Sequence, residues 1–217
     1  MKTLRTFFAL AVVACGLVRA QDVSPPPKPQ DSGPSLEATM KFIQERLEAI
    51  GPVNYIAYLH DNKTGNDWTN RDQNLTSEVK AIPATCLIEF DVSLKRTIGL
   101  DDGTATTWHA SGKFNLKSVL QVKVLTREQQ MKETDASAGH PEWSARVDPP
   151  VFVLRASAGL VDSKTRHHYT SGPDSYTNEK VESNLDFYFL DESMANRVAK
   201  AIVHAVELCG GGNKDPF

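Results

Sequence analysis

The histidines are the side chains in this sequence best suited to binding a metal ion or to moving a proton near neutral pH. His167 and His168 are adjacent in a predicted strand, so their side chains point to opposite faces and do not chelate one ion together. The other four lie in separate segments: His60, His109, His140 and His204. The sequence therefore predicts no metal site, and it predicts that His204 is solvated on the polar face of a helix.

Three short strings match motifs that serve acyl transfer by a serine nucleophile in penicillin-binding enzymes. They are Ser77-Glu78-Val79-Lys80, Tyr176-Thr177-Asn178 and Lys63-Thr64-Gly65. In those enzymes Ser-x-x-Lys opens a buried helix and precedes Lys-Thr-Gly. Here the order is reversed, Lys63-Thr64-Gly65 lies in a predicted polar loop, and Val79–Pro83 is predicted to be a strand. The sequence contains no Gly-x-Ser-x-Gly and no glycine loop for phosphate. We therefore expect no catalytic residues, no cofactor and no enzymatic activity.

Two tryptophans in polar segments, Trp68 and Trp143, are candidate interaction residues, because an indole can stack on a sugar or anchor a protein partner. The alternative, which we favour, is that each ring folds back over the edge of a sheet. The segments that carry them, Asp61–Gln73 and Thr126–Pro150, lack a clear apolar period and are predicted to be loops. The second contains at most a short helix around Glu128–Glu133.

The first twenty residues have the pattern of an export signal. Lys2 and Arg5 supply the positive start, Phe7–Ala14 is a short apolar run, and Val18-Arg19-Ala20 is an acceptable cleavage site. This run is too short to span a bilayer, and no later segment approaches about 20 apolar residues. We therefore predict a secreted or periplasmic protein without a transmembrane segment.

Cys15 leaves a second export route open. Val12-Val13-Ala14-Cys15 resembles the bacterial lipobox, in which the cysteine is lipidated and anchors the mature protein to the membrane. The proline-rich linker at residues 21–34 would then act as a stiff tether. Because fourteen residues would be short for such a signal, simple secretion is the preferred interpretation.

The charge of the mature chain excludes one class of partner. Cleavage after Ala20 removes three of the 24 Lys and Arg residues and none of the 27 Asp and Glu residues, which leaves a net charge of −6. A nucleic-acid or anionic-membrane binder needs a basic surface, so we expect neither partner. The remaining chain predicts one domain at residues 35–209 and a flexible tail at residues 210–217.

Two amphipathic helices are predicted at the ends of this domain. Ser35 is expected to cap the first, whose apolar residues recur at helical spacing: Leu36, Met40, Ile43, Leu47 and Ile50. Asp191 is expected to open the second, which runs to Cys209 and has its own apolar stripe: Met194, Val198, Ile202, Ala205 and Cys209. Both helices are therefore expected to bury one face against a sheet.

Between the helices the apolar residues alternate with a period of two, which is typical of strands. The clearest strand face is Cys86, Ile88, Phe90, Val92 and Leu94. Leu100-Asp101-Asp102-Gly103 predicts a hairpin turn. Cys86 and Cys209 are the two cysteines that remain after cleavage, and both lie on core-facing positions. We predict a disulfide between them, with two buried free thiols as the alternative.

The order helix, six to seven antiparallel strands, helix predicts an α+β fold. We expect a curled sheet or partly open barrel with an N-terminal helix and a packed C-terminal helix. Phe114-Asn115-Leu116-Lys117-Ser118-Val119, which leads into Val122 and Val124, and the closing unit Phe187–Leu208 resemble the pleckstrin-homology-like superfold. The resemblance covers about Val53–Cys209.

Lipid head-group binding is not implied by this resemblance. Lipid-binding members of the superfold carry clustered basic residues between their first two strands, and the matching segment Asp61–Gln73 has only Lys63 and Arg71 among three Asp residues. The whole chain also resembles small exported proteins of soil bacteria, which implies a location and no chemistry.

We therefore predict an exported, non-enzymatic binding or interaction domain for a protein or small-molecule partner. The first alternative is a small-molecule carrier that holds its ligand within the curled sheet, as lipocalins do. The Gly-x-Trp of lipocalins is absent, because Gly65 and Trp68 are one residue too far apart. A small hydrolase is a third interpretation, since catalytic residues can assemble from distant segments.

Overall fold

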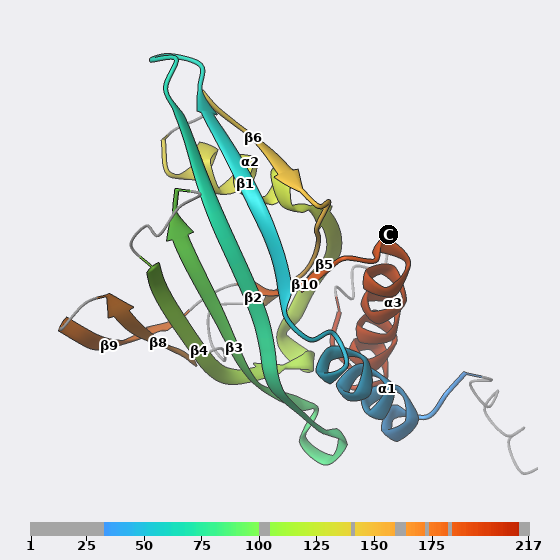
Figure 1. Ribbon diagram of the computed structural model, residues 1–217. Coiled ribbons are helices and arrows are strands. Elements are labelled where there is room, and N and C mark those ends of the chain that lie inside the picture. The colour runs from blue at the N-terminus through green and yellow to red at the C-terminus, as the bar shows by residue number, and fades with distance from the viewer. Residues whose placement is uncertain are drawn as a thin grey trace, which may run out of the picture. The chain divides into compact units, whose positions relative to one another are not determined.

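Three helices and two antiparallel sheets make up the computed structural model (Figure 1). It describes residues 33–99, 105–139, 142–158, 164–171, 174–181 and 184–212. The predicted signal peptide at 1–20 with Cys15, the linker up to residue 32, the hairpin turn at 100–103 and the tail from residue 213 lie outside these ranges. The predicted domain at 35–209 falls within one unit, Pro34–Phe217.

The larger sheet has the strand order β6-β1-β2-β3-β4-β8-β9, with every neighbouring pair antiparallel. Its strands are β1 (Val53–Asp61), β2 (Asp67–Ile82), β3 (Leu87–Ile98), β4 (Ala105–Asn115), β6 (Trp143–Asp148), β8 (Lys164–Ser171) and β9 (Asp174–Val181). The smaller sheet has the order β10-β7-β5 and is also antiparallel. Its strands are β5 (Val119–Thr126), β7 (Phe152–Ala158) and β10 (Asn184–Phe189). The α+β class with antiparallel sheets is therefore confirmed.

The two predicted amphipathic helices are present as α1 (Leu36–Glu48) and α3 (Glu192–Leu208). The Ser35 hydroxyl accepts a hydrogen bond from the Ala38 N–H, and the Asp191 carboxylate accepts one from the Ser193 N–H, so both caps form as expected. The helices pack against each other, and their apolar stripes are buried in one core with residues of both sheets (Figure 1).

The predicted disulfide joins Cys86 to Cys209. Cys86 follows a short 3₁₀ turn, η1 (Pro83–Thr85), and has a positive φ of 57°. Its partner ends α3. The bond therefore fastens the C-terminal helix to the turn between β2 and β3, and the interpretation as two free thiols is wrong.

The number of strands was underestimated, because the described residues form ten strands in two sheets where six to seven were predicted. The supposed loop Asp61–Gln73 is a turn followed by the first half of β2. In this part of β2, polar residues are buried at every second position, namely Asn70, Asp72 and Asn74. Polar side chains therefore occupy the core-facing positions of a strand, and this hides the usual apolar period.

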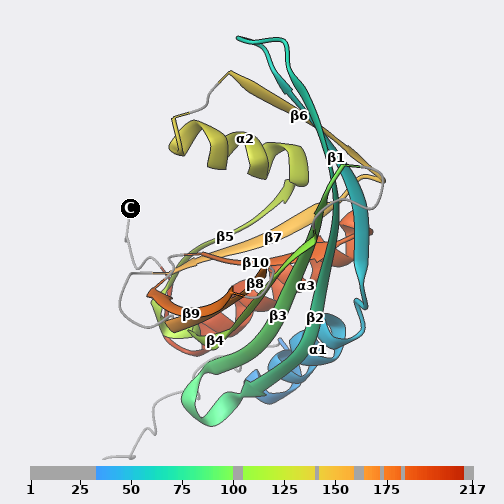
Figure 2. The same cartoon turned by 60° about the vertical axis from the view of Figure 1, so that its left-hand side comes forward.

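The supposed loop Thr126–Pro150 is also mostly regular structure. It contains β6 and a further helix, α2 (Arg127–Ser137), which is longer than the short helix expected around Glu128–Glu133. Figure 2 shows α2 between β5 and β6, and it contacts both strands as well as β7. Because α2 is polar almost all round, its sequence lacks the stripe by which a surface helix is recognised.

Candidate ligand-binding cleft

A row of polar side chains crosses the buried face of the larger sheet. Tyr55 of β1 pairs with Asp72 of β2, which pairs in turn with Arg96 of β3, so the three side chains lie on one face. Asp72 is fully buried. Its carboxylate accepts two hydrogen bonds from Arg96, one from Nε and one from Nη2, both of 2.8 Å. This bidentate pairing compensates the burial of the Asp72 charge.

A second guanidinium reaches the same row from α2. Arg127 at the start of that helix is buried, and its Nε donates to the Tyr55 hydroxyl at 2.9 Å. Its Nη2 lies 3.9 Å from the Asp72 carboxylate, and its Nη1 donates to Gln130. Asp72 is thus shared by two guanidiniums, one in direct bidentate contact and one at longer range.

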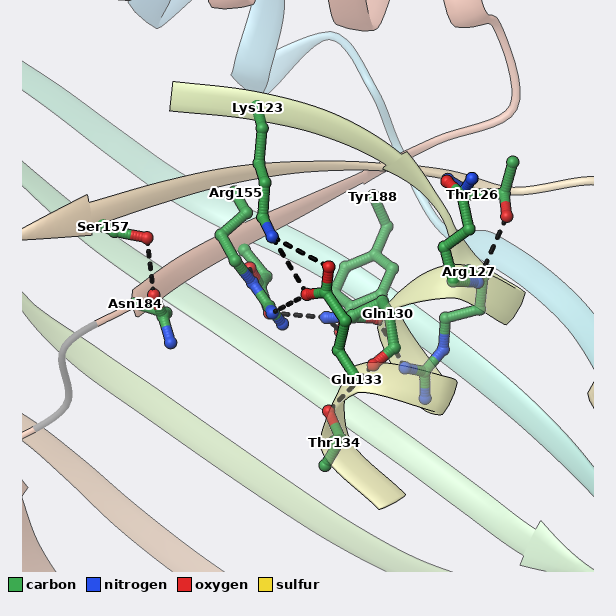
Figure 3. Close-up of polar contacts among 12 residues, drawn as sticks. Lys123, Thr126, Arg127, Gln130, Glu133, Thr134, Arg155, Ser157, Asn184 and Tyr188 are labelled. Carbon is green, nitrogen blue, oxygen red and sulfur yellow. Dashed lines mark hydrogen bonds and ion pairs between the residues drawn. The ribbon is translucent and has the colours of Figure 1, made fainter. Parts of the chain in front are cut away.

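Gln130 carries the network across to the smaller sheet (Figure 3). Its amide nitrogen donates to the Asp186 carboxylate and, at 3.3 Å, to the Tyr188 hydroxyl, both on β10. Asp186 also accepts two hydrogen bonds of 2.8 Å from Arg155 of β7. One turn further along α2, Glu133 accepts from Lys123 and from Arg155. Hydrogen bonds and ion pairs therefore hold α2 between the two sheets.

The pKa values of the arginine and tyrosine side chains in this network are raised. The hydrogen bond to Asp72 raises the pKa of the Arg96 guanidinium, and the hydrogen bond to Asp186 raises that of Arg155. Burial raises the pKa values of the Tyr55 and Tyr188 hydroxyls. The guanidiniums therefore stay charged and both phenols stay protonated at neutral pH. The arrangement presents a constant pattern of donors and acceptors, which suits recognition better than proton transfer.

Beside the network lies a cleft of about 380 Å³ between the buried face of the larger sheet and β10. Its walls are mainly apolar and come from β3, β4 and β10: Phe90, Val92, Leu94, Trp108, Ala110 and Leu185. Polar side chains of the network also line it: Asn74, Arg96, Asp186 and Tyr188. This volume lies within the usual range for small-molecule sites, and so does the combination of apolar walls with a few fixed polar groups.

The register of the strands explains the two-sided character of the cleft. Leu94 pairs with Trp108 and Val92 with Ala110, which puts two apolar rows next to the row of Arg96. The Arg96 guanidinium lies 5.7 Å from the centroid of the Trp108 ring, so the indole marks the boundary between the polar and the apolar part.

Comparison with protein families, with curated proteins and with solved structures finds no significant match. The function of the cleft is therefore inferred from its geometry.

The two candidate tryptophans lie together in the larger sheet and do not line the cleft. Trp68 is in β2 and Trp143 begins β6, and their ring centroids are 5.5 Å apart at a tilt of 38°. Trp68 is 38% exposed. The structure therefore brings together two residues that the sequence placed in separate loops.

Of the histidine candidates, His109 of β4 and His168 of β8 are paired by the register of the larger sheet. His60 contacts Asp67 at 2.8 Å, and the partly exposed His204 donates to the Pro34 carbonyl at 3.0 Å. Ser77 lies in β2, and its hydroxyl donates to Asp91. Within the described ranges, no group of three His, Cys, Asp or Glu side chains is placed to hold a metal ion. In the same ranges, no helix is long and apolar enough to cross a bilayer.

The polar residues of the cleft were missed by the sequence analysis because their partners are distant in the chain. The one available signal was the spacing of Asn70, Asp72 and Asn74, which alternate within a segment that has few glycines and no proline. When polar side chains have buried partners, their alternation indicates a strand in the same way as the alternation of apolar residues does.

Proposed function

We propose that this chain is an exported, non-enzymatic binding domain and that its cleft holds a small, largely apolar molecule. The observation that carries the proposal is the cleft itself, with apolar walls on β3 and β4 and fixed polar groups at one side. Of the predicted functions, the small-molecule carrier fits this geometry best. The protein-interaction alternative relied on two long loops, and both are mostly regular structure.

The buried network supports this proposal because it makes the cleft preorganised. Asp72 and Asp186 each accept a bidentate pair of hydrogen bonds, and Gln130 links the groups around them. Side chains that are already immobilised lose little further entropy when a ligand binds. A site of this kind can bind a small molecule without rearranging its polar side.

Export remains part of the proposal. It relies on the signal-like sequence at residues 1–20 and is compatible with the disulfide, since such bonds persist in oxidising compartments. Lipidation at Cys15 is the alternative. The resemblance to the pleckstrin-homology-like superfold and the closure of the strands into a barrel stay predictions.

The proposal is tested with a neutral apolar fluorophore, N-phenyl-1-naphthylamine, and a matched pair of variants. Ala110→Phe fills the cleft, whereas Ala105→Phe adds the same ring to the same strand at an exposed position of opposite parity. We expect fluorescence enhancement with the wild type and Ala105→Phe, and none with Ala110→Phe.

Equal enhancement by all three proteins, or none with the wild type, would contradict the proposal and favour a partner at Trp68 and Trp143. Circular dichroism of each variant confirms that it is folded. Native mass spectrometry of protein purified from its host adds an independent readout, since a retained small ligand is expected for the wild type.

A further inference from the structure

The arginine in the cleft wall has hydrogen-bonding capacity that the protein itself leaves unused. A guanidinium carries five N–H donors in a planar fork. Arg96 donates two of them to Asp72, from Nε and from Nη2. Within the described part of the chain no other acceptor is bound to Arg96, so both N–H groups of Nη1 and the second of Nη2 remain. One N–H of Nη1 and one of Nη2 form the outer edge of the fork, and 27% of the side chain is exposed.

The carboxylate and the phenol of β10 beside the cleft, in contrast, already accept hydrogen bonds within the protein. Both oxygens of Asp186 accept hydrogen bonds from Arg155, and one also accepts from Gln130. The Tyr188 hydroxyl accepts from Gln130 as well. A ligand therefore meets unused donors at Arg96 and, at Asp186, a carboxylate that already accepts three hydrogen bonds, which favours a ligand group that accepts hydrogen bonds.

The charges around Arg96 also favour a ligand group that accepts hydrogen bonds. Asp72 is the carboxylate shared by the guanidiniums of Arg96 and Arg127, and the other groups that Arg127 contacts are neutral, namely Tyr55 and Gln130. Two positive charges thus face one negative charge. A ligand with a single negative charge would balance this group, and a cationic ligand would add to the repulsion.

We propose that the ligand is an amphiphile with a carboxylate head, bound by the outer Nη1–Nη2 edge of Arg96, and with an unbranched apolar tail along β3. This inference rests on the proposed function. Planar carboxylates fit the two parallel donors of a guanidinium edge. The tail follows Leu94, Val92 and Phe90, which precede Arg96 in the chain at every second position of the strand. From Arg96 to Phe90 this row extends over roughly 20 Å.

The test compares three head groups on one tail: dodecanoate, 1-dodecanol and dodecylammonium. The chain has three tryptophans, so Trp68→Phe/Trp143→Phe leaves Trp108 as the one indole, directly beside Arg96. Its fluorescence reports binding at the head-group end. We expect dodecanoate to bind about tenfold or more tighter than dodecanol, because hydrogen bonds between charged groups exceed neutral ones. Dodecylammonium should bind more weakly than dodecanol.

Arg96→Lys provides the second measurement, because it keeps the positive charge and removes the fork. We expect it to lower the preference for dodecanoate over dodecanol, while Ala110→Phe blocks all three compounds. Equal or tighter binding of dodecanol to the wild type overturns the carboxylate assignment and leaves the cleft as a binding site. Absence of binding by every compound refutes the proposed function itself. The head-group comparison uses no variant at Arg96, so it tests the carboxylate assignment even if Arg96→Lys fails to fold.

Discussion

Breaking the Cys86–Cys209 bond should cost this domain a large part of its stability. The two cysteines are separated by 123 positions, so the bond closes most of the sheet strands and α3 into one loop. In the loop-entropy model, −2.1 − 1.5R ln n with n of 123 gives about −16 cal/mol/K, or ~5 kcal/mol at 25 °C. Small domains are stable by roughly 5–15 kcal/mol, so the loss is a substantial share of the total.

The assay is urea unfolding followed by circular dichroism for the oxidised protein, the reduced protein and Cys86→Ala/Cys209→Ala. Reduction of the wild type keeps both sulfur atoms in the core and isolates the effect of the bond. The double variant adds the loss of two buried thiols, since both cysteines are buried, and should be less stable still. The urea dependence should become steeper in the reduced protein, because an open unfolded chain exposes more surface.

A stability loss below about 2 kcal/mol on reduction would refute this reasoning, since it lies well under the range expected for a loop of this length. It would mean that the unfolded chain already keeps the two ends close, or that the apolar stripe of α3 alone fixes that helix. Helix content measured on the reduced protein under native conditions separates these two explanations.

Two further predictions concern side chains outside the apolar core. Asp72→Ala should lower the free energy of unfolding by about 3–5 kcal/mol, because it leaves the buried Arg127 guanidinium and the partly buried Arg96 guanidinium without their shared carboxylate; urea unfolding measures this, and a loss under 1 kcal/mol would contradict the shared-charge account. Hydrogen bonds from Ser193 lower the pKa of the Asp191 carboxyl below its ordinary value of 3.8. A carboxyl whose pKa is lowered in the folded state contributes its full stabilisation when the pH is above its ordinary pKa. This contribution is lost as the pH falls through the lower pKa of the folded state. The stability difference between wild type and Asp191→Ala should therefore be constant from pH 5 to 7 and shrink below pH 3.8 in thermal melts; a difference that does not change with pH would exclude the charged cap.

The parts of the fold that the sequence predicted correctly are those governed by local rules. The helix caps at Ser35 and Asp191 depend on contacts within three residues, and the stripes behind them repeat at fixed spacing. The Cys86–Cys209 pairing was predictable although it is long-range, because only these two cysteines lie outside the predicted signal peptide and both had core-facing positions.

The cleft depends on contacts that no local pattern encodes. Arg127 meets Tyr55 across 72 residues, and Gln130 meets Asp186 across 56. A buried arginine or glutamine is identified by its partner, and the sequence alone does not tell which carboxylate or phenol lies opposite. For the same reason α2 was expected only as a short helix, since its polar residues have the composition of a solvated segment.

The position of α2 has a consequence for how this protein can change during evolution. The helix bonds to the larger sheet through Arg127 and to the smaller sheet through Gln130 and Glu133, and its Met131 belongs to a small apolar cluster separate from the main core around α1 and α3. Substitutions that lengthen or shorten these polar bridges alter the spacing of the sheets without touching the main core around α1 and α3. The capacity of the cleft can therefore change while that core stays the same, and related chains can diverge in what they accommodate while conserving it.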